Sequence, residues 1–153
     1  MNELGIIRKF NGIHADQTSE YTHLHCTRYI DHLINHHGWK NEYIKDQPTP
    51  MRSDPKYQNE LQETEGPTDP TEARKLQTKM GFNYRQLIGK LIYAYTTCRV
   101  DIAAAIITLS QHSHQPAPIH YKALKHVLLY LHATKHHGIT YWRPHPRPDL
   151  PLK

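Results

Sequence analysis

Residues 84–134 read YRQLIGKLIYAYTTCRVDIAAAIITLSQHSHQPAPIHYKALKHVLLYLHAT, and this stretch decides the fold because its apolar residues recur with the period of a helix. Apolar side chains three and four positions apart lie on one helical face, so the pattern predicts amphipathic helices. The first apolar stripe contains Tyr84, Leu87, Ile88, Leu91, Ile92 and Tyr95, the second Ile102, Ala105, Ile106 and Leu109, and the third Leu124, Val127, Leu128 and Leu131. Three helices are therefore expected to bury these stripes against one another.

The expected helix ends lie where particular residues interrupt a helix. Asp101 is suited to cap the second helix, and Pro116 and Pro118 separate the second helix from the third. Gly138 closes the third helix, and residues 138–142 (GITYW) then have the composition of one β-strand. A single strand is not stable alone, which indicates that its neighbour is missing.

A strand pattern precedes the helical region. Apolar residues alternate at Leu4, Ile6 and Phe10, and a second short run covers residues 21–26, so the two runs predict a β-hairpin. The period changes to that of a helix at Thr27. Its apolar face contains Tyr29, Ile30, Leu33, Ile34 and His37, and Gly38 supplies the stop.

An acidic, proline-rich stretch separates these two parts. The whole chain has a net charge of +5, yet residues 46–72 hold seven acidic and only two basic residues. Residues 46–70 also contain five of the 11 prolines and hardly any apolar residue, so they bury too little surface to offset the entropy of ordering. We therefore expect a disordered linker there, and an extended tail over the proline-rich residues 144–153.

Composition narrows the class of protein. The 153 residues suffice for one ordinary domain or two small pieces. No apolar run is long enough to span a bilayer and the N-terminus lacks a signal-peptide pattern, so we expect no membrane partner. Cys26 and Cys98 form no CxxC pair, which favours reduced thiols in an intracellular protein. The predicted fold class is α+β, with an N-terminal hairpin plus helix, a linker, and a three-helix unit with a terminal strand.

Several runs of the sequence match one family in the same order. The matching runs are Leu4–Ile6, Tyr29–Asp31, Gly38–Trp39, Pro48–Pro50, Tyr84–Ala94, Thr97–Ile102, Leu109–Gln111 and His120–Thr134. Over residues 3–143 the chain resembles the Pol polyprotein of Ty1/copia-type LTR retrotransposons, between the reverse-transcriptase palm and the RNase H domain. The resemblance implies that residues 1–45 end the polymerase domain, 46–70 are a linker, 71–143 are a thumb- or connection-like helical region, and 144–153 are a tail.

The polymerase chemistry of that family needs residues that this sequence does not contain. Two-metal catalysis requires clustered carboxylates that hold two cations. The family carries them on a palm strand with a YVDD-type motif, which does not occur here, and no two acidic residues are adjacent. No downstream set of RNase H carboxylates is found either. The resemblance therefore implies a non-catalytic fragment without a cofactor of its own, whose parent polymerase uses Mg²⁺ in the missing palm.

The same resemblance indicates a role in holding nucleic acid. In reverse transcriptases the region after the palm runs along the RNA–DNA duplex, and phosphate contacts position a duplex without reading its sequence. The expected contacts of the third helix are Lys122, Lys125, His132 and Lys135, and the weaker candidates are Arg8, Lys9, Arg85, Lys90 and Arg99. The alternative is that these residues form a solvated basic face.

Two other functions remain open at this point. The chain is either an interaction module that folds only with the rest of the polyprotein, or a histidine-rich zinc-binding protein. For zinc, His23 and His25 share a strand face next to Cys26, and His132 and His136 have the spacing of an i, i+4 helical pair. The resemblance implies a location in the cytoplasm, including virus-like particles, with passage into the nucleus in the parent family.

Overall fold

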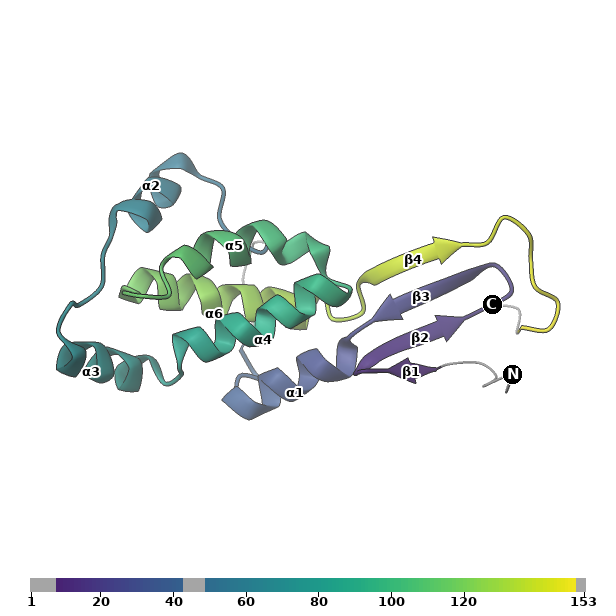
Figure 1. Ribbon diagram of the computed structural model, residues 1–153, viewed down its shortest axis with the longest axis horizontal. Helices are drawn as coiled ribbons and strands as arrows, with labels where there is room; N and C mark the ends of the chain where they lie inside the picture. The colour runs from purple at the N-terminus through teal and green to yellow at the C-terminus, as the bar shows by residue number, and fades with distance from the viewer. Residues whose placement is uncertain (1–7, 43–48, 151–153) are drawn as a thin grey trace.

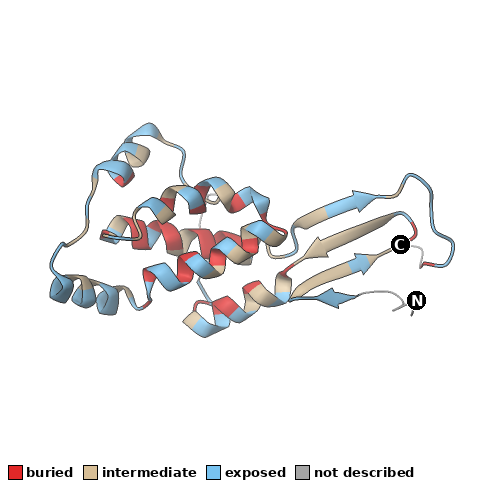
Figure 2. Ribbon diagram, in the orientation of Figure 1, coloured by how far each residue is buried: buried red, intermediate tan, exposed pale blue. Residues whose placement is uncertain are grey.

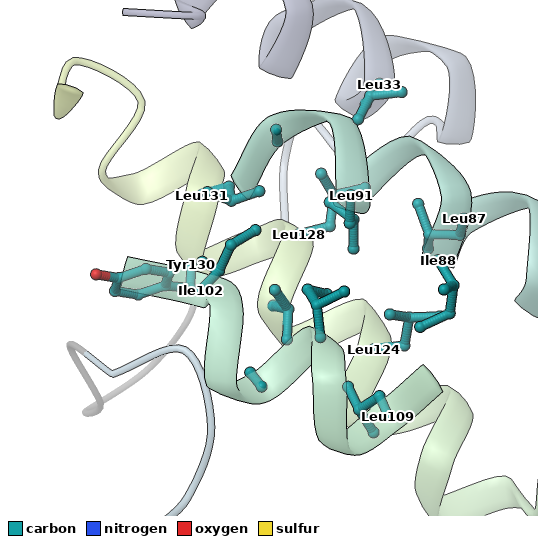
Figure 3. Packing of buried hydrophobic residues seen from close by; sticks show 14 of the residues in the cluster. Leu33, Leu87, Ile88, Leu91, Ile102, Leu109, Leu124, Leu128, Tyr130 and Leu131 are labelled. Atoms are coloured by element: carbon teal, nitrogen blue, oxygen red, sulfur yellow. The ribbon is translucent and has the colours of Figure 1, made fainter. Parts of the chain in front are cut away.

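The three apolar stripes meet in one core, as predicted, except that Ile92 of the first stripe is exposed. The computed structural model describes residues 8–42 and 49–150. The three helices are α4 (Tyr84–Thr97), α5 (Ala103–Gln111) and α6 (Pro118–Ala133), and α1 (Thr27–His37) packs beside them (Figure 1). Leu91, Ile106 and Leu124 are fully buried. Figure 3 shows these helices directing leucine and isoleucine side chains into a common centre.

Local sequence signals account for most helix ends. The Asn83 side chain accepts a hydrogen bond from the backbone N–H of Gln86 and caps α4. Gly38 ends α1 in the left-handed region with φ 70°, as its position predicted. The expected cap of α5 by Asp101 is wrong. Asp101 lies inside a 3₁₀ turn, η1 (Val100–Ile102), and its carboxylate binds other partners.

Those partners form a network around a buried guanidinium. Arg99 is only 1% exposed, and its Nε and Nη2 atoms donate to the two carboxylate oxygens of Asp101 at 2.9 and 2.7 Å. Nη1 donates to the carbonyl oxygen of Thr134, and the hydroxyl of Tyr130 donates to Asp101. A buried cation needs such complete pairing. The network therefore joins the end of α4 to the end of α6.

Strand β4 (Gly138–Trp142) has a partner, contrary to the expectation of an isolated strand. It pairs antiparallel with β3 (Tyr21–His25), with Tyr21 opposite Trp142 and His25 opposite Gly138. The pattern could not show this because the two strands are far apart in the sequence. The sheet order is β1-β2-β3-β4, and Figure 1 shows the sheet projecting from one end of the helical unit.

The N-terminal hairpin differs from the predicted one. The structure forms β1 (Lys9–Phe10) and β2 (Ile13–Gln17), and β2 then pairs antiparallel with β3. Leu4 and Ile6 of the predicted first strand lie outside the described residues. The turn between β1 and β2 is Asn11-Gly12, with both φ values positive at 48° and 84°. Asn-Gly is the usual sequence of a two-residue hairpin turn, so the signal for β2 was present in the sequence.

The stretch expected to be a disordered linker contains a helix. Its described part, residues 49–70, includes α2 (Pro55–Glu63), which Asp54 caps by accepting a hydrogen bond from the N–H of Tyr57. Leu61, its single large aliphatic residue, is fully buried. The Nδ1 atom of the buried His120 accepts from the N–H of Ala117, so Nε2 carries the hydrogen and donates to the carbonyl oxygen of Leu61 at 2.7 Å.

A second contact fixes the segment that follows α2. The N–H of Gly66 donates to the carbonyl oxygen of Gln115 at 3.1 Å, and the Gln115 amide donates back to the Gly66 carbonyl. A Cβ atom at Gly66 would overlap the Pro116 carbonyl. The next helix is α3 (Pro70–Met80), which is capped by Asp69 and ends at Gly81. The sequence pattern did not predict α3 as a helix separate from α4. A few specific contacts thus order a segment whose composition is that of a linker.

The proline-rich tail also packs against the sheet over its described part. The N–H of Arg143 donates to the carbonyl oxygen of Glu20 at 2.8 Å, and the N–H of Arg147 donates to that of Ser19 at 3.0 Å. Leu150 is buried. The expected extended tail is therefore folded back across the β2–β3 turn as far as residue 150, as Figure 1 shows.

Burial is uneven between the two parts of the molecule. In Figure 2 the buried residues concentrate in the helical unit, whereas the strands are half-buried or exposed. Phe10 and Trp142 on the sheet are both 68% exposed. No helix in the described ranges is long and apolar enough to cross a membrane. The predicted α+β class is confirmed.

We expect Gly138→Ala to lower the free energy of unfolding by about 1–3 kcal/mol, the usual cost of overpacking. A Cβ atom there would overlap the Leu24 carbonyl oxygen and push β4 away from β3. Gly89→Ala is the matched control because a Cβ atom at Gly89 meets nothing within 4 Å and the residue lies inside α4. This control should gain about 0.5–1 kcal/mol in urea unfolding. Equal stability of the two variants would contradict the close strand approach.

Mild acid should destabilise the fold through His120. Burial lowers the pKa of His120 from 6.5, although its bond to Leu61 opposes the shift. The unfolded chain therefore takes up a proton at higher pH than the folded chain. The free energy of unfolding is greatest above about pH 6.5 and falls as the pH drops towards the folded pKa. Urea midpoints measured from pH 7.5 to 5.5 should fall less in His120→Gln, because the glutamine amide offers one acceptor and one donor but does not titrate. An unchanged pH dependence in that variant would rule His120 out as a cause.

Candidate nucleic-acid interface

Three permanent cations line one groove at the junction of the sheet and α1. The groove has a volume of about 520 Å³ and runs along β2, beside the start of the short strand β1. Lys9 is the first residue of β1 and Arg8 directly precedes it, whereas Arg28 lies in the first turn of α1. All three residues are exposed. His14 and Asp16 of β2 line the groove as well.

Two local features position these side chains. The Asn11-Gly12 turn folds β1 back onto β2, so that Lys9 lies opposite His14, and the Tyr93 hydroxyl of α4 donates to the Asn11 carbonyl. On the other side, α1 begins directly after β3, which places Arg28 beside His14. The hairpin turn and the strand-to-helix junction therefore bring together cations from residues 8–28.

The charges in the groove favour an anionic ligand. Burial lowers the pKa of His14, and the charges of Arg28, His25 and Lys9 lower it further. His14 is therefore neutral at pH 7, which leaves three cations and the Asp16 carboxylate. Asp16 lies 3.2 Å from Nε2 of His25. Arginine and lysine side chains around an open groove can bind the oxygens of a phosphate backbone.

The α6 candidates are exposed to different extents. Lys122 is exposed. Lys125 pairs with Glu42, with Nζ 2.6 Å from Oε2, and the same ammonium lies 4.7 Å from the centre of the Trp39 ring. Lys135 lies beyond the end of α6 and pairs with Asp31 at 3.0 Å. His132 is half-buried. Acidic residues from around α1 thus already engage two of these four residues.

The remaining predicted residues do not join a common surface. Arg85 is exposed, and its Nε donates to the carbonyl oxygen of Ser113. Lys90 is half-buried on α4. The prediction that Arg99 contacts phosphate is wrong, because its guanidinium is buried and paired with Asp101 and Thr134. Arg8 and Lys9 are the two predicted candidates that the structure places together, and Arg28 is the cation that the sequence analysis missed.

The histidines do not assemble a zinc site in the described part of the chain. His23 and His25 share a face of β3 as expected, and their ring centres are 5.6 Å apart. Nδ1 of His23 lies 2.8 Å from the Thr140 hydroxyl, and Nε2 lies 3.2 Å from the His136 carbonyl oxygen. Because α6 ends at Ala133, His132 and His136 are not an i, i+4 helical pair. Residues 8–42 and 49–150 hold no group of three potential metal ligands.

Comparison with curated proteins identifies relatives of most of the chain. The chain is 37% identical over 132 residues to the retrovirus-related Pol polyprotein from transposon RE1 of Arabidopsis thaliana, and 35% identical over 130 residues to that from transposon RE2. Each match covers 85% of this chain. A shorter match, 40% identical over 60 residues, is to secreted RxLR effector protein 161 of Plasmopara viticola and covers 39% of this chain and 42% of that protein.

The chain spans only a small part of its long relatives. It covers about 8% of the RE1 and RE2 polyproteins. No protein-family model matches the chain, and no solved structure matches it. The two matches over most of the chain nevertheless agree with the motifs at residues 3–143. The chain is therefore homologous to a segment of the retrovirus-related Pol polyproteins of copia-type transposons.

Proposed function

We propose that this chain is a non-catalytic segment of a reverse transcriptase, an RNA-directed DNA polymerase, that helps to hold the RNA–DNA primer–template duplex in the full polyprotein. The homology to Pol polyproteins supports the parent enzyme class. The Mg²⁺-binding carboxylates of the polymerase would then belong to another segment of the parent polyprotein. In this proposal the protein acts in the cytoplasm and in virus-like particles, with passage into the nucleus.

The groove lined by Arg8, Lys9 and Arg28 is the observation that carries this proposal. These three cations form no ion pair with any residue that the structure describes, whereas Lys125 and Lys135 are already in ion pairs. Cations from a strand edge and a helix start can follow successive phosphates of a backbone. Such contacts depend on salt and not on base sequence. The exposed Lys122 is a further contact in the proposal.

The sheet supports a second role, as an interaction module within the polyprotein. Phe10 and Trp142 are 68% exposed and Tyr141 is 57% exposed. Phe10 and Tyr141 lie at the two edges of one face of the sheet, and Trp142 lies on the other face. The rest of the Pol polyprotein is the proposed partner of these exposed side chains. In that case the exposed strands pack against it, and the groove at the sheet's base holds the duplex.

Removing the three groove cations should weaken duplex binding and reduce its salt dependence. We expect the triple variant Arg8→Gln, Lys9→Gln and Arg28→Gln to bind with a shallower salt dependence. The negative slope of log K for binding against log salt concentration should become smaller in magnitude by about 2–3. The measurement is fluorescence anisotropy of a labelled RNA–DNA hybrid with the full chain, titrated between about 50 and 200 mM salt. Two hybrids of unrelated sequence should give the same loss.

A control variant removes the same number of positive charges, from three exposed lysines at the opposite end of the molecule. Lys56→Gln, Lys75→Gln and Lys79→Gln lie on α2 and α3, away from the sheet (Figure 1). This variant should keep the wild-type slope apart from the small effect of net charge. Equal losses in both variants would show that only overall charge matters. Unchanged binding in the groove variant would overturn the proposed interface.

A further inference from the structure

Strand β4 leaves one of its two edges open. The sheet order is β1-β2-β3-β4, so among the described residues β4 has a neighbouring strand on one side only. Residues 143–150 turn away over the β2–β3 turn, and Figure 1 shows β4 along the margin of the sheet. Such an edge presents backbone N–H and C=O groups to which a further strand can bind.

The hydrogen bonds between β3 and the chain after β4 show which backbone groups point outwards. The N–H of Arg143 donates to the carbonyl oxygen of Glu20 at 2.8 Å, so Arg143 directs its backbone groups towards β3. Hydrogen-bonded and non-hydrogen-bonded positions alternate along an antiparallel pair. Tyr141 and Ile139 therefore also bond to β3. The residues that direct their N–H and C=O groups to the open edge are Gly138, Thr140 and Trp142.

The open edge lacks the features that usually prevent strands from pairing. Natural sheets protect their edges with short strands, charged side chains or proline. The opposite edge of this sheet follows that rule, because β1 has only two residues and begins with Lys9. Strand β4 has five residues, and its sequence GITYW contains neither a charge nor a proline. The composition of β4 is therefore suited to pairing with another strand.

The sequence of β4 is complementary to itself when a second copy runs antiparallel to it. With Thr140 opposite Thr140 of the second copy, Gly138 lies opposite Trp142 and Ile139 lies opposite Tyr141. The outward-pointing residues then face each other and can exchange both backbone hydrogen bonds. Each glycine leaves room for the opposite indole ring, and isoleucine with tyrosine is a favourable cross-strand pair.

We propose that two copies of this chain associate through the open edges of β4, in a two-fold symmetric antiparallel pair centred on Thr140. The two four-stranded sheets then form one continuous sheet. Figure 1 shows the helical unit at the N-terminal end of β4, so antiparallel pairing places the two helical units at opposite ends of the paired strands. The groove cations Arg8 and Lys9 lie at the other edge of the sheet, and the dimer leaves them uncovered.

Sedimentation velocity of the full wild-type chain, without nucleic acid, tests this proposal. One strand pair is a small interface, so the concentration should run from about 10 µM to about 1 mM. The average mass should rise from that of one copy towards twice that value. Salt should favour the dimer, because two copies with a net charge of +5 repel each other. A chain that stays monomeric over the whole range overturns the proposal.

Residue-resolved amide exchange of the wild-type chain locates the contact. At the lowest concentration the outward N–H groups of Gly138, Thr140 and Trp142 should exchange rapidly, and at the highest concentration they should be protected. The N–H groups of Ile139 and Tyr141 should be protected at both concentrations, because they donate to β3. Association without new protection of the outward amides would show that the copies meet elsewhere, which overturns the proposal.

A charged residue at the two-fold axis should weaken the association. Thr140→Lys places two ammonium groups opposite each other, and the dissociation constant of the dimer should rise about tenfold. The Thr140 hydroxyl lies 2.8 Å from Nδ1 of His23, so protection of the Ile139 and Tyr141 amides serves to check that the variant keeps β4 paired with β3.

The matched control is Thr78→Lys, which adds the same charge at an exposed position of α3. This control should associate as the wild-type chain does. Equal weakening in Thr140→Lys and Thr78→Lys would show that net charge controls the association, and unchanged association in Thr140→Lys would exclude the β4 edge. Either result overturns the proposal.

Discussion

The antiparallel pairing of β3 with β4 joins residues 21–25 to residues 138–142 and sets where the sheet meets the helical unit. Each of these strands adjoins a helix in the sequence, because α1 follows β3 directly and β4 comes shortly after α6. The pairing is close at Gly138, where only a glycine fits against the Leu24 carbonyl. Thr27 strengthens the junction, since its hydroxyl donates to the Lys135 carbonyl oxygen at 2.8 Å. The pairing thereby brings the N-terminal and C-terminal strands together next to the start of α1, where the groove cation Arg28 lies.

Several features of the molecule depend on this junction. Arg28 lines the groove because α1 starts at the end of β3. A cavity beside Cys98 is completed by His136, His137 and Gly138. The proposed phosphate groove thus depends on this strand pairing.

Local patterns predicted those elements whose stability is encoded within one segment. The apolar periods of α4, α5 and α6, and the helix from Thr27 to Gly38, could be read because each amphipathic face lies in consecutive residues. The partner of β4 and the helix α2 could not be read this way. Leu61 is held by a hydrogen bond from His120, which lies 59 residues further along the chain. The Asn11-Gly12 turn was the readable signal that was overlooked.

Contacts between distant segments also limited how much of the candidate site could be predicted from the sequence. A basic residue can be recognised in a sequence, but its partners come from other elements. Asp101 neutralises Arg99 inside the protein, and Glu42 engages Lys125. Arg8 and Lys9 were named because they are cations on a strand, whereas Arg28 became a candidate only when the β3-to-α1 junction placed it beside His14. Tertiary structure therefore selects which of the basic residues remain available to an anion.

The pairing of β3 with β4 is the central claim, and hydrogen–deuterium exchange of the backbone amides tests it most directly. Strand β4 is the edge strand of the sheet, so only its amides that donate to β3 are protected by the pairing. Those amides exchange only when the pair opens, so they should exchange as slowly as the amides of residues 21–25 that donate to β4. Exchange of residues 138–142 at the rate of an unstructured peptide, while residues 21–25 and α6 remain protected, would contradict the account.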